Sequence, residues 1–412
     1  MNKKTVIILL LPLATLTLLF SADKVLLKIF GIPVKPDLRD VFFLPPNTAV
    51  VYQGPEFSYL AKTNSLGFRG REYQKPKAVN TVRILAFGDS FTFGNGADEN
   101  DIWITVLEKN LGRRLKDRKI EIFNLGQPGT SPYNYLDNIK KFVPLFNPDI
   151  LLIGIVEGED IGQIAPPPEK QFIPAQSGDT VRNRLLARIA AGQSFSDKTV
   201  NIGRYITNLF PYFSALLSPY KKVDIRPANM SNLVTLISRV ADEQLTSIEN
   251  TIDPEVLDMY LKGDLNPNLL SLAIAKPDFF SAFMENDEIV KQAAEKLGVV
   301  FNEISTVAEN HGAVPFIVDI PYGLFISKVR ADTMVKMGFM YSGQPWMSGE
   351  PVDFLKQAAS PSGMTVFDNL SYFREKCADD CFFPYDGHFN AKGNKLLAKH
   401  LEEYLMGFLK KN

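Results

Sequence analysis

The segment Phe87-Gly88-Asp89-Ser90-Phe91-Thr92-Phe93-Gly94 decides how the fold of this chain is interpreted. It follows the apolar run 82–87, which predicts a buried strand, and it precedes a helical pattern over about 101–116. Turns at the carboxyl ends of parallel strands are where α/β proteins place reactive groups. Ser90 is therefore a candidate nucleophile, although an Asp-Ser pair after a strand is also ordinary turn and helix-cap chemistry.

Strand and helix patterns continue to alternate beyond this turn. Further buried strands are predicted at 120–125, 150–156, 314–320 and 364–368, and further helices at 132–144, 286–311 and 391–409. Such alternation is typical of a parallel sheet covered by helices on both faces. The first three strands end in glycine-rich and polar turns, so these turns should gather at one edge of the sheet.

The composition is that of an ordinary globular protein. Of the 412 residues, 45% are hydrophobic and 22% are charged, which is enough apolar material for a large core. The chain has 45 basic and 46 acidic residues, so its net charge is −1. Because no basic field would attract a polyanion, we expect no nucleic-acid partner.

Residues 1–22 predict a targeting or anchoring segment. Two lysines precede the uncharged run 5–22, whose 18 residues are close to the lower limit for a membrane-spanning helix. A retained membrane anchor and a cleaved signal peptide both fit this pattern, and Phe20 at the −3 position of a cut after Ala22 favours the anchor. Either interpretation places the remaining chain outside the cytoplasm, held at the inner membrane or released into the periplasm or medium.

The rest of the chain divides into an extension, a split α/β domain and an insertion. We expect a proline-rich extension at 23–78, an α/β domain at 79–160 and 284–412, and a largely helical insertion at 161–283. Within the insertion, the helical stretches are 232–250 and 254–262, and an aromatic, proline-containing segment covers 203–220. Two interpretations of this insertion are equally compatible with the sequence. It is either a cap beside the reactive edge of the sheet or a surface insertion without a catalytic role.

Histidine is scarce, which narrows the choice of a general base. Of three histidines, only His388 lies in a glycine-containing loop with a carboxylate, Asp386, two residues before it. A carboxylate in this position can orient the ring and stabilise its cation. His311 ends a helical stretch and His400 lies inside the last helix, so neither is favoured.

Four blocks resemble the SGNH/GDSL hydrolase motifs in order and in approximate spacing. They are Phe87-Gly88-Asp89-Ser90, Asn124-Leu125-Gly126-Gln127-Pro128-Gly129, Glu157-Gly158-Glu159-Asp160 and Asp386-Gly387-His388. The upstream segment Asn64-Ser65-Leu66-Gly67-Phe68-Arg69-Gly70 is similar to an extension of exported bacterial members. The resemblance covers about 79–160 and 284–409. It implies a flavodoxin-like three-layer α/β/α sandwich and acyl-ester chemistry without a cofactor or metal.

The resemblance also implies roles for individual residues. Ser90 would be the nucleophile and would offer its own backbone N–H to the oxyanion, with Gly126 as another backbone donor. His388 would deprotonate Ser90, and Asp386 would position His388. This agrees with elementary chemistry, because a weak hydroxyl nucleophile needs an adjacent base and the base needs an orienting group.

Two features depart from the family pattern. Glu159 stands where the third block normally has an asparagine that donates to the oxyanion. Such a donor is worth roughly 3–4 kcal/mol in the transition state, whereas an ionised carboxylate would repel the oxyanion. An active enzyme must therefore keep Glu159 protonated, turn it away, or draw donors from elsewhere.

The second departure is the position of the acid. Many members carry it three residues before the histidine, where this chain has Tyr385, whereas Asp386 lies two before. The shorter spacing occurs in some polysaccharide-modifying relatives. Asp379 and Asp380 are weaker candidates for the acid that positions His388.

The resemblance and the exported topology together predict a serine esterase that acts on ester-linked acyl groups, with acylated extracytoplasmic carbohydrate as the expected substrate. An O-acyltransferase that modifies a polysaccharide is one alternative, since it uses the same acyl-enzyme. A catalytically lapsed carbohydrate-binding or assembly protein with the SGNH fold is another. A lipid-directed esterase is weaker, because aromatic clusters are more often core. The sequence does not reveal whether the chain has a protein partner.

Cys377 and Cys381 are the only cysteines of the chain. In an exported protein, a small disulfide loop and two unpaired thiols are both compatible with this pair. Two cysteines without a histidine at metal-ligand spacing do not predict a zinc site.

Overall fold

The computed structural model describes residues 3–30, 44–164, 181–190, 209, 221–285, 287–377 and 379–410. Its centre is a five-stranded sheet in the order β4-β3-β5-β7-β8, with every neighbouring pair parallel. The strands are β3 (Thr81–Phe87), β4 (Lys119–Asn124), β5 (Ile150–Val156), β7 (Val314–Ile320) and β8 (Thr365–Phe367). Counted in chain order, this is the 2-1-3-4-5 order of flavodoxin-like folds.

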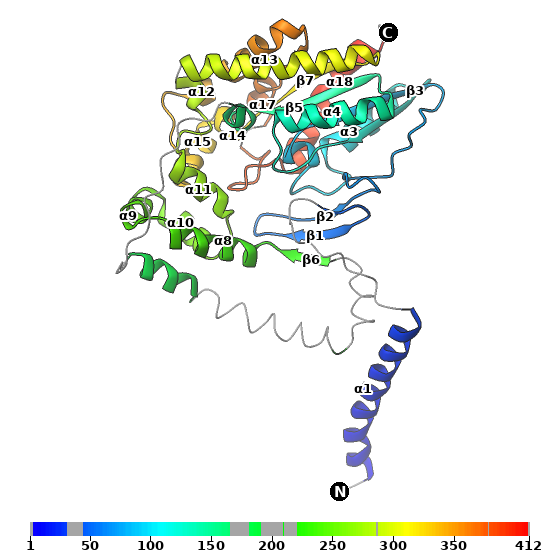
Figure 1. Cartoon of the computed structure of the whole chain (residues 1–412). Helices are drawn as coiled ribbons and strands as arrows, with labels where there is room; N and C mark the ends of the chain where they lie inside the picture. The colour runs from blue at the N-terminus through cyan, green and yellow to red at the C-terminus, as the bar shows by residue number, and fades with distance from the viewer. Residues whose placement is uncertain are drawn as a thin grey trace.

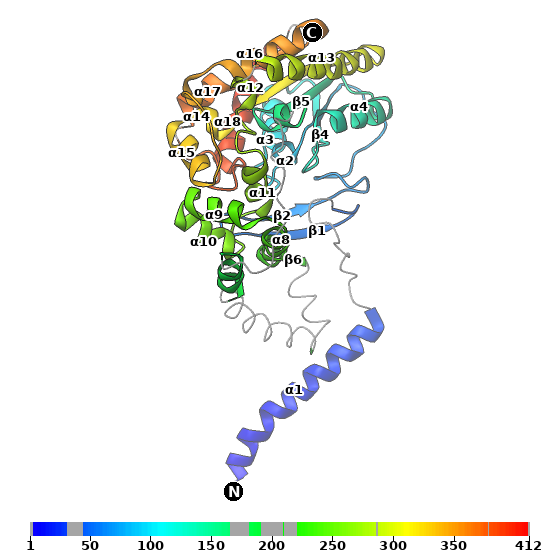
Figure 2. The ribbon, with the colours of Figure 1, turned by 60° about the vertical axis from the view of Figure 1, so that its left-hand side comes forward.

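Helices cover both faces of this sheet (Figures 1 and 2). On one side, α3 (Trp103–Arg114) packs against α18 (Ala391–Leu409). On the other, α13 (Asp287–Asn310) packs between α4 (Pro132–Phe146) and α16 (Glu350–Ala359). Every residue of β5 is buried, as expected for a strand enclosed from two sides. The predicted three-layer α/β/α fold is confirmed, and the predicted elements of this domain end within about two residues of the observed ones.

A second, smaller sheet joins the extension to the insertion. It has the order β2-β1-β6 and contains β1 (Ala49–Gln53), β2 (Ser58–Lys62) and β6 (Lys221–Asp224). Strand β1 is antiparallel to β2 and parallel to β6. The sequence pattern did not predict β6, because this strand is short and half of its residues are lysines. Figures 1 and 2 show this sheet beside the α/β domain, next to α8 (Arg226–Arg239).

The described part of the insertion is otherwise helical. It contains α8 (Arg226–Arg239), α9 (Asp242–Thr251), α10 (Pro254–Leu261) and α11 (Pro267–Ala275). The single helix predicted at 232–250 is wrong, because the backbone is extended at Val240 and Ala241. Arg182 stabilises this break, since its guanidinium donates to the carbonyl oxygens of Ile237 and Val240. The predicted segment 203–220 lies outside the described residues, apart from residue 209.

Short helices connect these larger elements. They are α2 (Ser90–Phe93), α5 (Glu159–Ile164), α12 (Ala282–Glu285), α14 (Gly323–Ile326), α15 (Lys328–Lys336), α17 (Leu370–Lys376), η1 (Pro345–Met347) and η2 (Ser360–Ser362). Near the amino terminus, α1 covers Lys3–Phe30. Over the residues that the structure describes, no helix has both the length and the apolarity needed to cross a membrane.

Candidate active site

Ser90 begins α2 directly after β3, at the carboxyl edge of the sheet. Asp89 caps this helix, because its Oδ1 accepts the N–H of Phe91 at 2.9 Å. Gly88 permits the tight turn, since a Cβ there would lie 2.1 Å from Oγ1 of Thr92. The local sequence therefore holds the Ser90 hydroxyl at the end of a rigid strand.

Ser90, His388 and Asp386 form a hydrogen-bonded triad. Nε2 of His388 lies 2.7 Å from Oγ of Ser90, and Nδ1 of His388 lies 2.6 Å from Oδ1 of Asp386. The two-residue spacing works because Gly387 has a φ of +84°, which turns the loop back so that Asp386 faces the ring. The structure thus brings together the three side chains that the sequence singled out.

The two substitutes considered for Asp386 lie elsewhere. Asp379 accepts a hydrogen bond from the hydroxyl of Ser327, and Asp380 is paired with Lys392. Neither carboxylate is bonded to His388.

The charges of the site favour a protonated histidine at neutral pH. Burial by itself disfavours the imidazolium, but the Asp386 carboxylate outweighs burial, helped by Glu159 and Asp89. Together they raise the pKa of His388 to about 9.

Three further carboxyl groups near the triad have raised pKa values. Burial, and the nearby Asp160, raise the pKa of Asp89 to about 7. Burial, and then Asp89, raise the pKa of Glu159 to about 7. Burial raises the pKa of Asp160 as well, and its two oxygens accept from the Tyr135 hydroxyl and the Val156 N–H, both at 2.8 Å. Glu159 is therefore about half protonated at neutral pH.

These shifts predict that the protein loses stability as the pH rises. A carboxyl whose folded pKa is raised favours the folded state at low pH, and this contribution disappears between about pH 4 and pH 7 for Asp89 and Glu159. The contribution of His388 is present below about pH 6.5 and is lost as the pH approaches 9. We expect a melting temperature several degrees lower at pH 8.5 than at pH 5.5. Thermal unfolding at both pH values measures this, and a higher melting temperature at pH 8.5 would contradict it.

Gly126 was expected to donate its N–H to the oxyanion. In this structure that N–H donates to Oδ1 of Asn124 at 3.0 Å. Packing explains why this residue is glycine. A Cβ at Gly126 would lie 2.5 Å from the backbone nitrogen of Phe93, so glycine allows this turn to pack against α2. The N–H of Ser90 lies in the first turn of α2, where helical N–H groups lack an intrahelical acceptor.

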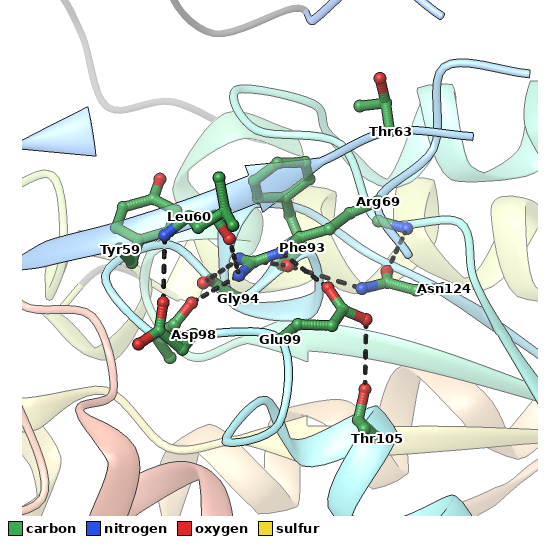
Figure 3. Close-up of polar contacts among 12 residues, drawn as sticks. Tyr59, Leu60, Thr63, Arg69, Phe93, Gly94, Asp98, Glu99, Thr105 and Asn124 are labelled. Carbon is green, nitrogen blue, oxygen red and sulfur yellow. Dashed lines mark hydrogen bonds and ion pairs between the residues drawn. The ribbon is translucent and has the colours of Figure 1, made fainter. Parts of the chain in front are cut away.

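Arg69, in the extension, holds the far end of α2. Figure 3 shows its guanidinium directed at the carbonyl oxygens around Gly94. The side chain is fully buried and donates to the carbonyls of Phe93 at 3.2 Å, Gly94 at 2.6 Å and Ala97 at 2.5 Å. Glu99 adds an ion pair at 3.3 Å. The extension therefore fixes the helix that begins with Ser90.

Replacing Arg69 with methionine is expected to destabilise the fold by at least about 3 kcal/mol, because three buried carbonyls lose their donor at a cost of about 1–3 kcal/mol each. Urea unfolding measures the loss. Arg71→Met is the matched control, since Arg71 pairs with Glu108 with 45% of its side chain exposed. We expect that control to lose less than about 1 kcal/mol. Equal losses in the two variants would show that Arg69 has no special structural role.

The loop that carries the triad acid and base is held from two sides. Glu56, between β1 and β2, accepts the backbone N–H groups of Tyr385 at 3.0 Å and Asp386 at 2.8 Å. Arg330 of α15 donates to the carbonyls of Phe382 at 3.0 Å and Phe383 at 3.1 Å. No sequence signal identified either residue, because each acts through backbone atoms of a segment distant in the chain.

A cavity of about 390 Å³ opens beside the triad. His388 and Asp386 line it, together with Tyr52 and Phe57 of the extension and Leu269 of the insertion. The described part of the insertion therefore lies beside the reactive edge.

The two cysteines are both buried and unbonded to each other, so the disulfide considered from the sequence is not formed. The thiol of Cys381 instead donates to the carbonyl oxygen of Cys377 at 3.4 Å. Among the described residues, no group of three or more histidine, cysteine, aspartate or glutamate side chains is arranged to hold a metal ion.

No family model matches the chain, and a search of curated proteins found no match. Solved structures do match it at low identity. A lipase/acylhydrolase from Enterococcus faecalis is 11% identical, with 79% of this chain and 96% of that chain covered and a TM-score of 0.36. An acetylxylan esterase from Geobacillus stearothermophilus is 10% identical, with 80% of this chain and 95% of that chain covered and a TM-score of 0.37. A protein assigned to the lipolytic G-D-S-L family, from Desulfitobacterium hafniense, is 12% identical, with 78% of this chain and 98% of that chain covered and a TM-score of 0.33.

The strand order of this chain and the positions of its four blocks decide the fold. Three blocks directly follow β3, β4 and β5, and the fourth precedes α18 at the same edge of the sheet. The fold is therefore the flavodoxin-like α/β/α sandwich that the resemblance to the SGNH/GDSL hydrolases implied.

Proposed function

We propose that the chain is a serine esterase that cleaves acyl esters through an acyl-enzyme. The observation that carries this proposal is the continuous hydrogen-bonded path from Ser90 through His388 to Asp386. A hydroxyl 2.7 Å from an imidazole nitrogen, with a carboxylate 2.6 Å from the other nitrogen, is the arrangement that activates a serine.

The reaction proceeds in two halves. Nε2 of neutral His388 takes the proton of Ser90 as Oγ attacks the ester carbonyl, and it then passes that proton to the departing alcohol. Water attacks the acyl-serine while His388 again takes a proton, and the carboxylic acid leaves as Ser90 is restored. Asp386 stabilises the imidazolium in both halves.

Two donors would stabilise the oxyanion. The N–H of Ser90 is one, and the carboxyl group of Glu159 in its protonated form is the other. The raised pKa of Glu159 supports this second role, because it keeps a proton on the group near neutral pH. When ionised, the same group would repel the oxyanion.

We place the reaction outside the cytoplasm and take acylated carbohydrate as the substrate. The amino-terminal pattern of residues 1–22 supports export and attachment to the membrane, and the cavity beside His388 supports a substrate larger than a simple ester. An O-acyltransferase is the second candidate. It differs only in that a sugar hydroxyl, rather than water, attacks the acyl-serine.

The test is release of acid from a small acetyl ester by the purified chain, with Ser90→Ala as the comparison. Adding an unacetylated oligosaccharide then separates hydrolysis from transfer. Acetate as the sole product indicates an esterase, whereas acetylated oligosaccharide indicates a transferase. Absence of both products under all pH conditions would contradict the proposed function and favour a lapsed, carbohydrate-binding protein.

A further inference from the structure

We propose that the cavity of about 390 Å³ beside the triad binds a glycan chain that carries no carboxylate, sulfate or phosphate groups. This inference rests on the proposed function, because it names the substrate class of the same site. It goes beyond that function by excluding acidic polysaccharides and fatty esters.

The position of the cavity connects it to the reacting hydroxyl. His388 and Asp386 line the cavity, and Nε2 of His388 is 2.7 Å from Oγ of Ser90. The walls come from the β1–β2 hairpin and from the insertion around α8 and α11. A bound chain would therefore lie between the extension and the insertion, with one end at the triad.

One wall of the cavity is aromatic. The rings of Tyr52 and Tyr59 stack with centroids 5.3 Å apart, and Phe57 meets Tyr59 edge-on at 5.7 Å. Tyr52 and Tyr59 are buried, so they hold in place the partly buried ring of Phe57, which can meet the C–H face of a sugar ring at little cost in conformational entropy. This wall alone would also accept an acyl chain.

The remaining lining distinguishes a sugar from an acyl chain, because it is rich in amides. Five asparagines line the cavity: Asn95, Asn229, Asn232, Asn266 and Asn268. An amide both donates and accepts, as a sugar hydroxyl does. Asn95 accepts from the Tyr59 hydroxyl and Asn229 donates to the Gly263 carbonyl, so each keeps its other polar atom for a ligand. A fatty chain would bury these atoms without partners, which is unfavourable.

The charges of the lining exclude acidic glycans. Glu56, Asp264 and Asp386 contribute carboxyl groups, and among the described lining residues there is no lysine or arginine. The imidazolium of His388 is the one cation in this lining, and it is paired with Asp386 at 2.6 Å. Arg226, at the start of α8, is paired with Asp224 at 2.7 Å and does not line the cavity. Like charges in a partly enclosed site repel, so uronate, sulfate and phosphate groups are disfavoured.

The test measures binding separately from chemistry. The full-length Ser90→Ala protein is titrated by calorimetry with three tetrasaccharides: neutral cellotetraose, the amine-bearing chitosan tetramer and anionic tetragalacturonate. We expect at least one of the first two to bind at least tenfold more tightly than tetragalacturonate. Equal or tighter binding of tetragalacturonate would overturn the inference.

A charge reversal in the cavity should change this selectivity. Asp264→Lys, made in the Ser90→Ala protein, is expected to shift the ratio of affinities at least tenfold toward tetragalacturonate. Asp117→Lys is the matched control, since Asp117 is 68% exposed on the side chain and does not line the cavity. The same shift in both variants would mean that general surface charge sets the preference, which overturns the inference.

Two outcomes separate this inference from the proposed function. If the unmodified chain hydrolyses an acetyl ester but Ser90→Ala binds no tetrasaccharide, the glycan inference fails and the esterase stands. If tetrasaccharide binds but no ester is cleaved, the cavity assignment stands and the esterase fails. A steep rise in kcat/KM from acetyl to decanoyl esters would overturn the glycan inference in favour of a lipid substrate.

Discussion

Replacing Ser90 with alanine is expected to lower kcat/KM for a small acetyl ester by at least about 10³-fold. The variant lacks the oxygen that forms the acyl-enzyme, so His388 has no nucleophile to activate. The residual rate would come from water attacking the ester within the same oxyanion site. Initial rates over a range of ester concentrations give the change in kcat/KM directly.

Ser58→Ala provides the control for this measurement, because Ser58 is exposed on β2 and is not part of the triad. We expect it to keep the full rate, and both variants to unfold at about the same temperature. A Ser90→Ala protein that is folded and still as active as the unmodified chain would refute the nucleophile assignment.

Replacing Glu159 with glutamine is expected to change the pH profile strongly. Catalysis needs His388 neutral and Glu159 protonated, yet their pKa values are about 9 and about 7. The required combination is therefore a minor one, on the order of 1% of molecules near pH 8, and the profile should be bell-shaped around that pH. Glutamine keeps a donor and cannot ionise. The variant should exceed the unmodified chain at least about tenfold at pH 8 and at least about a hundredfold at pH 9, because removing the charge of Glu159 also lowers the pKa of His388.

The measurement is kcat/KM between pH 6 and pH 10 for the unmodified chain, Glu159→Gln and a control. Glu303→Gln is a suitable control, because it removes the same charge from an exposed ion pair with Lys140. An unchanged alkaline limb in Glu159→Gln would show that Glu159 does not face the oxyanion. If the unmodified chain is silent at every pH and Glu159→Asn restores activity, the site has lapsed.

Several features of this protein could be read from short stretches of sequence. The buried strands, the helices and the turn at Ser90 were predicted because periodicity and turn chemistry act between near neighbours in the chain. His388 was singled out for similar reasons, since Asp386 and the intervening glycine are local to it. The helix predicted at 232–250 failed where a residue from outside that segment, Arg182, satisfies the carbonyls of the break.

Other features depend on segments that meet only in the folded chain. Gly126 was predicted to be an oxyanion donor, but its neighbour Asn124 takes its N–H and α2 packs against its Cα. The pairing of β6 with β1 joins residues about 170 positions apart. A strand of four mostly polar residues is too short to show a periodicity from which this pairing could be predicted. Arg69 and Glu56 bind backbone atoms of segments that are distant in the chain. Because every residue type has these backbone atoms, the sequence of those segments does not indicate the contact.

The amino-acid sequence by itself determined the α/β fold, which follows from local patterns of apolar and turn-forming residues. It also singled out the serine, histidine and aspartate, through local patterns together with the resemblance to the SGNH/GDSL motifs. The tertiary structure alone decided that Ser90 and His388, 298 residues apart, lie within hydrogen-bonding distance. It also decided the raised pKa of Glu159 and the cavity formed by the extension and the insertion. Burial and charge proximity are produced by packing between distant segments, and no short stretch of sequence contains that information.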